Sequence, residues 1–264
     1  MKRFDPLQKP AGNRISAFAG MVLLTGITIM PAAAAQLNLL ASTAVQTVLD
    51  EVLAQHERAS GDKVAVTIAS SASIMARLKA GETPDMVILT KEGIDELIAQ
   101  GKVVAGSRAE IASAGLGIAI KRGAPKPDIS SVDALKKTLL ASRSVAYTAT
   151  GASGLYFARL LERLGIAEAM KAKSNVLKSG LAGDVVARGE SDLGVQMVSE
   201  ILAAPGAELV GPLPAEVQST MVFTAGTLSG SARGAEAAAL VNFLNTPAVG
   251  QVFKAKGLDP VVAK

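Results

Sequence analysis

The sequence has no cysteine, no tryptophan and one histidine, and these absences exclude several classes of protein. Without cysteine there is no disulfide, no cysteine nucleophile and no thiolate zinc site. A single histidine also argues against a zinc enzyme, since such sites draw chiefly on histidine and cysteine. Aromatic residues make up only 3% of the chain, which disfavours a stacking platform for bases or sugars. The motifs G-x-S-x-G of serine hydrolases and G-x-G-x-x-G of dinucleotide binding are absent. We expect no metal and no cofactor.

The first 35 residues have the pattern of a cleaved secretory signal. A head with four lysines and arginines is followed by the apolar, uncharged segment 15–30 and by small residues that match an A-x-A cleavage site. The alternative is a membrane anchor, but the apolar stretch is short for a span of about 20 residues and Pro31 interrupts it. We therefore expect cleavage near Ala35 and a periplasmic location.

Most of the net charge lies in these first 35 residues, which are called the leader below. The chain carries a formal +4, and four basic residues with one acidic residue place +3 of it in the leader, so about +1 remains. A strongly basic surface is thus not expected, and neither is nucleic acid as a partner. Removing 35 of the 264 residues leaves 229, which is enough for one large domain or two lobes.

The remaining chain alternates strand-like and helix-like segments, a pattern typical of an α/β fold with largely parallel sheets. Expected strands lie at 36–42, 63–70, 85–90, 115–123, 144–149, 175–180 (strand or turn), 193–197 and 219–230. Expected helices lie at 43–61, 73–80, 92–101, 131–142, 153–165, 182–192, 198–202 and within 233–257. The strand–helix order is repeated three times before residue 102 and then starts again, although no tandem repeat of the sequence is convincing.

Three strand-to-helix junctions are rich in hydroxyl side chains: Ser42, Thr43, Ser70, Ser71, Ser73, Thr148, Thr150 and Ser153. In parallel α/β sheets such junctions gather at the carboxyl ends of the strands, where ligands bind. A helix start presents unpaired N–H groups and the positive end of the helix dipole, so it can hold an anion without a full positive charge. At any single junction the alternative is an ordinary N-cap. Three such junctions together predict an anion site.

The segments 39–90, 151–165 and 243–258 resemble periplasmic molybdate-binding proteins, the solute-binding subunits of ABC transporters. The resemblance extends over nearly all of the chain after the leader. It implies a type II two-lobed binding protein that takes a small anionic ligand between its lobes and delivers it to an ABC permease in the inner membrane. We expect it to be a monomer.

The resemblance also implies how the lobes are built. The first lobe would combine residues 36–115 and 223–264, and the second would contain 116–222. Two crossover strands, near 115–120 and 221–226, would connect them.

Carried over onto this sequence, the family's ligand loops imply eight binding residues: Ser42, Thr43, Ser71, Ser73, Ala152, Ser153, Gln196 and Met197. The last two depart from the family pattern, in which a tyrosine stands at the position of Met197. A tyrosine hydroxyl is lost there, and the amide of Gln196 both donates and accepts, whereas bare molybdate needs donors only. We therefore expect a small organic carboxylate, such as aconitate, ahead of molybdate.

The segment 199–218 is similar to the branch of this superfamily that contains bacterial aconitate isomerase. Interconverting cis- and trans-aconitate needs a general base, because a proton leaves one carbon and returns to another. Glu200 and Asp184 are candidate bases, while we expect His56 to be solvated and Asp85 to be structural. Candidate clamps for ligand carboxylates are Arg77, Arg159 and Arg188. A transport receptor and an isomerase both remain open.

Overall fold

The computed structural model describes residues 36–261, which belong to one compact unit. The expected signal segment lies outside the described residues, so the cleavage near Ala35 stays a prediction. Within 36–261 no helix is both long enough and apolar enough to span a bilayer.

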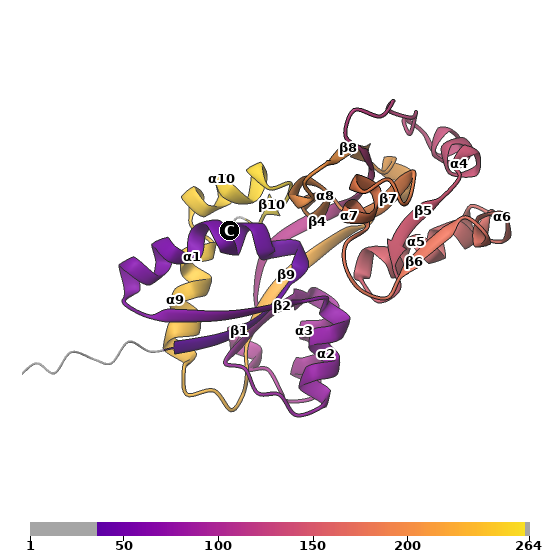
Figure 1. The fold of residues 1–264 in the computed structure, drawn as a ribbon. Helices are drawn as coiled ribbons and strands as arrows, with labels where there is room; N and C mark the ends of the chain where they lie inside the picture. Colours follow the sequence, from indigo (N-terminus) through magenta and orange to yellow (C-terminus); the bar gives the residue numbers. More distant parts are fainter. Residues whose placement is uncertain (1–35, 262–264) are drawn as a thin grey trace, which may run out of the picture. The chain divides into compact units, whose positions relative to one another are not determined.

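Ten strands and ten α-helices make up the described part of the chain (Figure 1). The strands are β1 (Gln36–Ser42), β2 (Lys63–Ala69), β3 (Met86–Thr90), β4 (Ala109–Lys121), β5 (Val145–Thr148), β6 (Ser174–Leu177), β7 (Leu193–Met197), β8 (Ala207–Pro212), β9 (Thr220–Thr227) and β10 (Asp259–Pro260). The helices are α1 (Gln46–Ser60), α2 (Ser71–Lys79), α3 (Lys91–Ala99), α4 (Val132–Ala141), α5 (Ala152–Arg163), α6 (Ala167–Lys171), α7 (Ala182–Ala187), α8 (Val198–Ala203), α9 (Gly234–Leu244) and α10 (Pro247–Ala255). Short 3-10 turns occupy Thr43–Val45, Ala105–Ser107 and Ala215–Val217.

The strands pair in the order β2-β1-β3-β9-β4-β7-β5-β6, and β8 and β10 both pair with β4. β1 is parallel to β2 and β3, and β5 is parallel to β6 and β7, as the repeated strand–helix pattern predicts. The pairs that β4 forms with β7, β8, β9 and β10 are antiparallel, as is the pair β3–β9. The predicted α/β class is confirmed, with mixed sheets.

The long strand β4 joins the two groups of parallel strands (Figure 1). Its first part pairs with β9 as far as Gly115 opposite Thr220, and from Leu116 onward it pairs with β7 and β8. β4 and β9 thus coincide with the two expected crossover strands, and β4 begins six residues before the expected 115. The lobe boundaries themselves stay a prediction.

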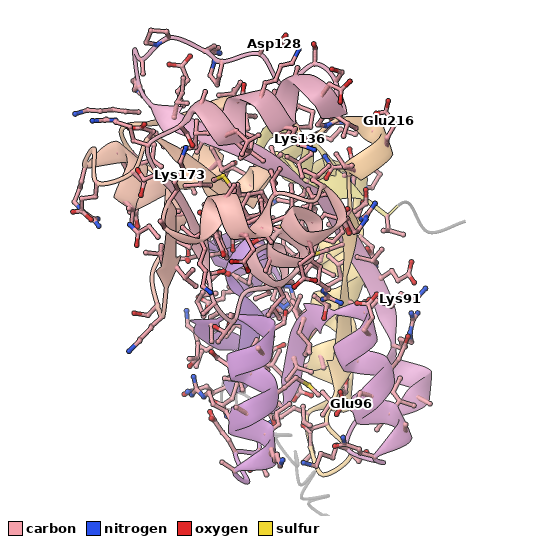
Figure 2. All side chains as sticks on the ribbon, turned by 90° about the vertical axis from the view of Figure 1, so that its right-hand side faces the viewer. Lys91, Glu96, Asp128, Lys136, Lys173 and Glu216 are labelled. Atoms are coloured by element: carbon pink, nitrogen blue, oxygen red, sulfur yellow. The ribbon has the colours of Figure 1, made fainter. Side chains whose placement is uncertain are left out.

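Apolar patterning explains which face each element buries. β3 is buried along Met86–Leu89, as expected for a central strand covered on both faces, and α5 buries Phe157, Leu160 and Leu161 on one stripe. Charged side chains such as Glu96, Asp128 and Glu216 are exposed (Figure 2). The largest cluster of buried apolar residues is continuous from β1 through β4 to α5, so the core supports both groups of strands.

His56 differs from its expected solvated state, because it is only 4% exposed. It lies one helical turn after the buried Val52 on α1, and this face of α1 packs against α9 and α10. The imidazole ring lies 5.1 Å from the ring of Phe243. Burial lowers the pKa of His56, although the nearby carboxylates of Asp62 and Glu57 act in the opposite direction.

Several local signals place helix ends as predicted. Ser131 caps α4, where its hydroxyl accepts a hydrogen bond from the N–H of Ala134, and Gly61 ends α1 in the left-handed conformation with φ 82°. The start of α2 differs from the expected Ser73. The helix begins at Ser71 because the Ser70 hydroxyl accepts from the N–H of Ser73 and caps it. The elements α6, β8 and β10 were not predicted.

Candidate functional site

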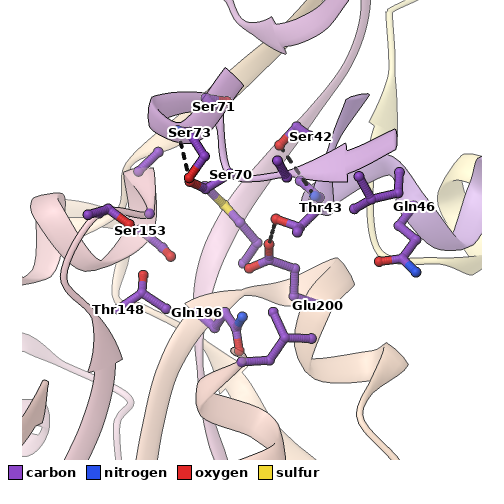
Figure 3. A pocket seen from close by; sticks show the side chains of 18 of the residues that line it. Ser42, Thr43, Gln46, Ser70, Ser71, Ser73, Thr148, Ser153, Gln196 and Glu200 are labelled. Atoms are coloured by element: carbon purple, nitrogen blue, oxygen red, sulfur yellow. Dashed lines mark hydrogen bonds between the residues drawn. The ribbon is translucent and has the colours of Figure 1, made fainter. Parts of the chain in front are cut away.

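A cavity of about 390 Å³ lies where β1, β2, β5 and β7 end at their carboxyl ends (Figure 3). Its wall contains all eight predicted ligand-binding residues and the candidate base: Ser42, Thr43, Ser71, Ser73, Ala152, Ser153, Gln196, Met197 and Glu200. These residues come together because β1 and β2 run parallel to each other, as do β5 and β7, so the loops that follow each pair emerge at one edge. Their role in binding a ligand stays a prediction.

Serine hydroxyls line the side of the cavity formed by the ends of β1 and β2. The hydroxyl of Ser42 accepts from the N–H of Ala44 at 3.4 Å, and that of Ser71 accepts from the N–H of Thr90 at 3.3 Å. Ser70, the cap of α2, lies 2.9 Å from the hydroxyl of Ser73. A hydroxyl that accepts from a backbone N–H keeps its own proton for donation. This wall can therefore both maintain the helix starts and donate to an anion.

The opposite wall is the first turn of α5. The helix has no side-chain cap at Gly151, so its first N–H groups are left for other partners. Gly154 allows this helix to start directly against the end of β5, because a Cβ there would lie 1.8 Å from the carbonyl oxygen of Thr148. The Thr148 hydroxyl is buried without a hydrogen-bond partner, and Ser153 lies beside it on this wall (Figure 3). The wall is therefore rich in donors.

Glu200 lies in the first turn of α8, buried with 8% of its surface exposed. The Thr43 hydroxyl donates to its Oε1 at 2.6 Å (Figure 3). Burial raises the pKa of Glu200, while hydrogen bonds from Thr43, Gln196 and the backbone of Met197 oppose that rise.

Gln196 is almost fully buried beneath the cavity. Its Oε1 accepts from the N–H of Gly183 at 3.1 Å, and its side chain also bonds to Glu200. Protein partners therefore fix the orientation of this amide. Among the described residues that line the cavity, Lys178 and Glu200 are the two that belong to the acidic or basic residue types.

The three candidate arginine clamps do not line the cavity, so the structure contradicts that expectation. Arg77 pairs with Glu82, and Arg188 pairs with Glu190. Arg159 is exposed and donates to a carbonyl of its own helix. Each lies beyond the first turn of its helix, whereas the cavity is formed by helix starts and strand ends.

The two candidate aspartates also lie away from the cavity wall. Asp184 is on α7 outside the cavity. Asp85 accepts from the backbone N–H of Asn38 at 2.9 Å and from the hydroxyl of Ser231 at 2.8 Å, which is the structural role expected for it.

The segment Lys178–Leu181 also lines the cavity, although the sequence did not indicate it. It follows β6 and precedes α7, so it is a fourth strand-to-helix junction of the same kind, with a serine and a glycine. Gln46 and Phe223 are further lining residues that the sequence gave no reason to select. Among residues 36–261 no group of three His, Cys, Asp or Glu side chains could hold a metal ion.

Helix-start N–H groups and hydroxyls around a cavity at strand ends have the chemistry that can hold a small anion, as in other α/β binding proteins. Residues 37–259 match the family described as bacterial extracellular solute-binding protein, and the chain belongs to this family. A protein of a Pseudomonas species named aconitate isomerase is 34% identical to this chain over 252 residues, which are 93% of this chain and 96% of that protein.

Solved structures of periplasmic binding proteins share the fold. The periplasmic molybdate-binding protein of Azotobacter vinelandii has a TM-score of 0.72 and 22% identity, with 86% of this chain and 100% of that chain covered. The sulfate-binding protein of Mycobacterium tuberculosis has a TM-score of 0.69 and 18% identity, with 86% and 87% covered. Likeness at this level establishes the periplasmic-binding-protein fold and leaves the ligand to be argued from the site.

Proposed function

We propose that this protein binds aconitate in the cavity and interconverts its cis and trans isomers, with Glu200 as the general base. The observation that carries the proposal is a buried carboxyl group on the wall of a cavity whose other walls are rich in hydrogen-bond donors. The 34% identity with an aconitate isomerase over nearly the full length of both chains supports it.

The charges around the cavity favour a carboxylate ligand over a bare oxyanion. A compact tetrahedral dianion would lie wholly beside the buried Glu200 carboxyl group, and no arginine lines the described wall to offset its charge. A tricarboxylate is longer, so one carboxylate can occupy the helix-start donors of α2 and α5 while another extends toward Lys178. The cavity volume of about 390 Å³ lies within the range of small-molecule sites.

The reaction is an allylic proton shift that a single carboxylate can perform. Glu200 takes a proton from the methylene carbon next to the double bond, and the electrons of that C–H bond form the new double bond. The electrons of the old double bond then take the proton back from the Glu200 carboxyl group at the other carbon. Negative charge that develops on the ligand carboxylates is stabilised by the serine hydroxyls and helix-start N–H groups. The raised pKa makes Glu200 a stronger base than an exposed glutamate.

A second function, that of a transport receptor, is favoured by family membership and by the likeness to molybdate- and sulfate-binding proteins. In that case the protein would bind the carboxylate in the periplasm as a monomer and dock on an ABC permease in the inner membrane. The two functions differ in one measurable property, which is turnover of the ligand.

The test combines binding and turnover. A thermal-shift screen would compare molybdate, tungstate, sulfate, citrate and both aconitates, and proton NMR in D₂O would follow each aconitate sample. We expect stabilisation by aconitate, conversion of one isomer to the other and deuterium incorporation at the exchanging carbon. Glu200→Gln should lower turnover by about 100- to 10,000-fold, whereas the exposed control Glu216→Gln should not. Binding of aconitate without conversion would support the receptor, and stabilisation by molybdate alone would refute the carboxylate assignment.

A further inference from the structure

A hydrogen bond between distant parts of the sequence holds the carboxyl group of Glu200. Thr43 stands at the start of the 3-10 turn after β1, and Glu200 lies 157 residues later on α8. Their side chains meet at 2.6 Å beside the cavity (Figure 3). This length is typical of a hydroxyl that donates to an ionised carboxylate. Thr43 was predicted to donate to the ligand, but in this structure its hydroxyl proton is directed at Glu200.

We propose that Thr43 is a positioning residue, whose hydroxyl fixes the Glu200 carboxylate in the orientation needed for proton transfer to and from the ligand. This inference rests on the proposed function.

The other donors to Glu200 cannot perform this task alone. The Met197 N–H and the Gln196 side chain belong to the strand β7 and its junction with α8, so they hold the carboxylate relative to its own helix. Thr43 adds a bond from the β1 junction, next to Ser42 on the serine-lined wall of the cavity. The bond therefore fixes the base relative to the wall where the ligand would lie. Positioning of this kind has large effects on rate, since a displacement of about 1 Å can cost roughly 100-fold.

Hydrogen bonds to the ionised form lower a carboxyl pKa, so removal of the Thr43 hydroxyl should raise the pKa of Glu200 further. Other charges do not compete with this effect. α8 packs against β4, β7, β8, α7 and the turn after β1. The acidic and basic residues on these elements, near the end of α10 and on the cavity wall are Glu110, Lys121, Asp184, Glu208, Lys254, Lys256 and Lys178. The causes that shift the pKa of Glu200 are burial and its three hydrogen bonds, with no contribution from these charges.

The experiment compares Thr43→Val, which keeps the shape and removes the hydroxyl, with Thr43→Ser, which keeps the hydroxyl. Thr67→Val, at an exposed position of β2 outside the cavity, is the matched control. Steady-state rates of aconitate conversion would be measured from pH 5 to 9. In parallel, protein labelled with ¹³C at the glutamate carboxyl carbon would be titrated by NMR, with Glu200→Gln used to assign the signal.

For Thr43→Val we expect a kcat at least about tenfold lower with KM changed less than about threefold. The acidic limb of the pH profile and the NMR pKa of Glu200 should both move to higher pH, because a hydrogen bond to the ionised form is lost. Thr43→Ser and Thr67→Val should match the parent protein. If Thr43→Val keeps the parent kcat and carboxyl pKa, or if Thr43→Ser behaves like Thr43→Val, the inference is wrong.

A variant that does not fold and a parent protein without turnover can each be told apart from a failure of the inference. If Thr43→Val does not fold, Thr43→Ala takes its place in the same measurements, and a Thr43→Ser variant with impaired turnover would still count against the inference. If the parent protein shows no turnover, the proposed function fails. The NMR titration then decides separately whether Thr43 controls the Glu200 carboxyl group, and an unchanged pKa would overturn that as well.

Discussion

Replacing Gly154 by alanine should separate α5 from the end of β5 and damage the cavity. The added Cβ would lie 1.8 Å from the Thr148 carbonyl oxygen, 2.7 Å from its carbonyl carbon and 2.9 Å from its hydroxyl. Contacts below 3.0 Å are essentially never seen for a real Cβ, so the first turn of the helix must move by about 1.2 Å, from 1.8 to 3.0 Å. The obstacle is backbone, which cannot rotate away as a side chain can.

The expected cost in unfolding free energy is about 1–3 kcal/mol, the usual range for overpacking. Alanine's better helix propensity, worth up to about 1 kcal/mol relative to glycine, offsets part of it. Because Ala152 and Ser153 move with the helix start, affinity for the ligand should fall by at least about tenfold. This estimate corresponds to the loss of one hydrogen bond of about 1.4 kcal/mol.

Urea denaturation followed by circular dichroism would measure stability, and calorimetry would measure affinity. The matched control is Gly234→Ala at the first position of α9, where a Cβ has no neighbour within 4 Å and φ is not positive. That substitution should be neutral or stabilising by about 0.4–1 kcal/mol. If Gly154→Ala is as stable as Gly234→Ala and binds the ligand equally well, the close approach of α5 to β5 does not shape the site.

Two further predictions concern Ser71 and His56. Ser71→Ala should weaken ligand binding by about 1–3 kcal/mol in calorimetry, as expected for the loss of a hydrogen bond to a charged group. If the affinity is unchanged, the role of Ser71 is structural, through the hydrogen bond that it accepts from the N–H of Thr90. Because the pKa of His56 is lowered in the folded protein, the unfolded chain binds more protons than the folded one below pH about 6.5. The contribution of neutral His56 to the free energy of unfolding is therefore complete above that pH. It is lost as the pH falls from about 6.5 toward the folded pKa. His56→Gln should therefore lose less stability than the parent between pH 7 and 5 in urea titrations, and parallel losses would contradict the burial argument.

Local signals allowed much of the architecture to be predicted. The strand–helix order, the cap at Ser131 and the end of α1 at Gly61 each depend on a few neighbouring residues, so they can be recognised before any tertiary contact is known. The short strands β8 and β10 could not be found this way. Each exists through its pairing with β4, and their sequences carry no clear alternation of their own.

In the candidate site too, some features could be predicted from the local sequence and others could not. The hydroxyl-rich junctions after β1, β2 and β5 were recognisable because parallel strands direct the residues that follow them to one edge. The junction at Lys178 obeys that rule too, but the segment before it is too short and too exposed to identify as a strand with certainty. The arginines were misjudged because residue type alone does not tell whether a side chain faces the cavity or an acidic neighbour on the surface.

The sequence by itself determined the α/β class and the order of strands and helices, since these follow from apolar periodicity. The chemistry of helix starts led to the prediction of an anion-binding wall, and the resemblance to periplasmic binding proteins led to the expected crossover strands. Only the tertiary structure decided the state of the two ionisable groups that matter most. His56 is buried, with its pKa lowered by that burial, because α9 covers its side of α1. Glu200 meets Thr43 because the chain returns after 157 residues to the end of β1. Burial and long-range hydrogen bonds set a pKa, and neither is encoded in the spacing of neighbouring residues.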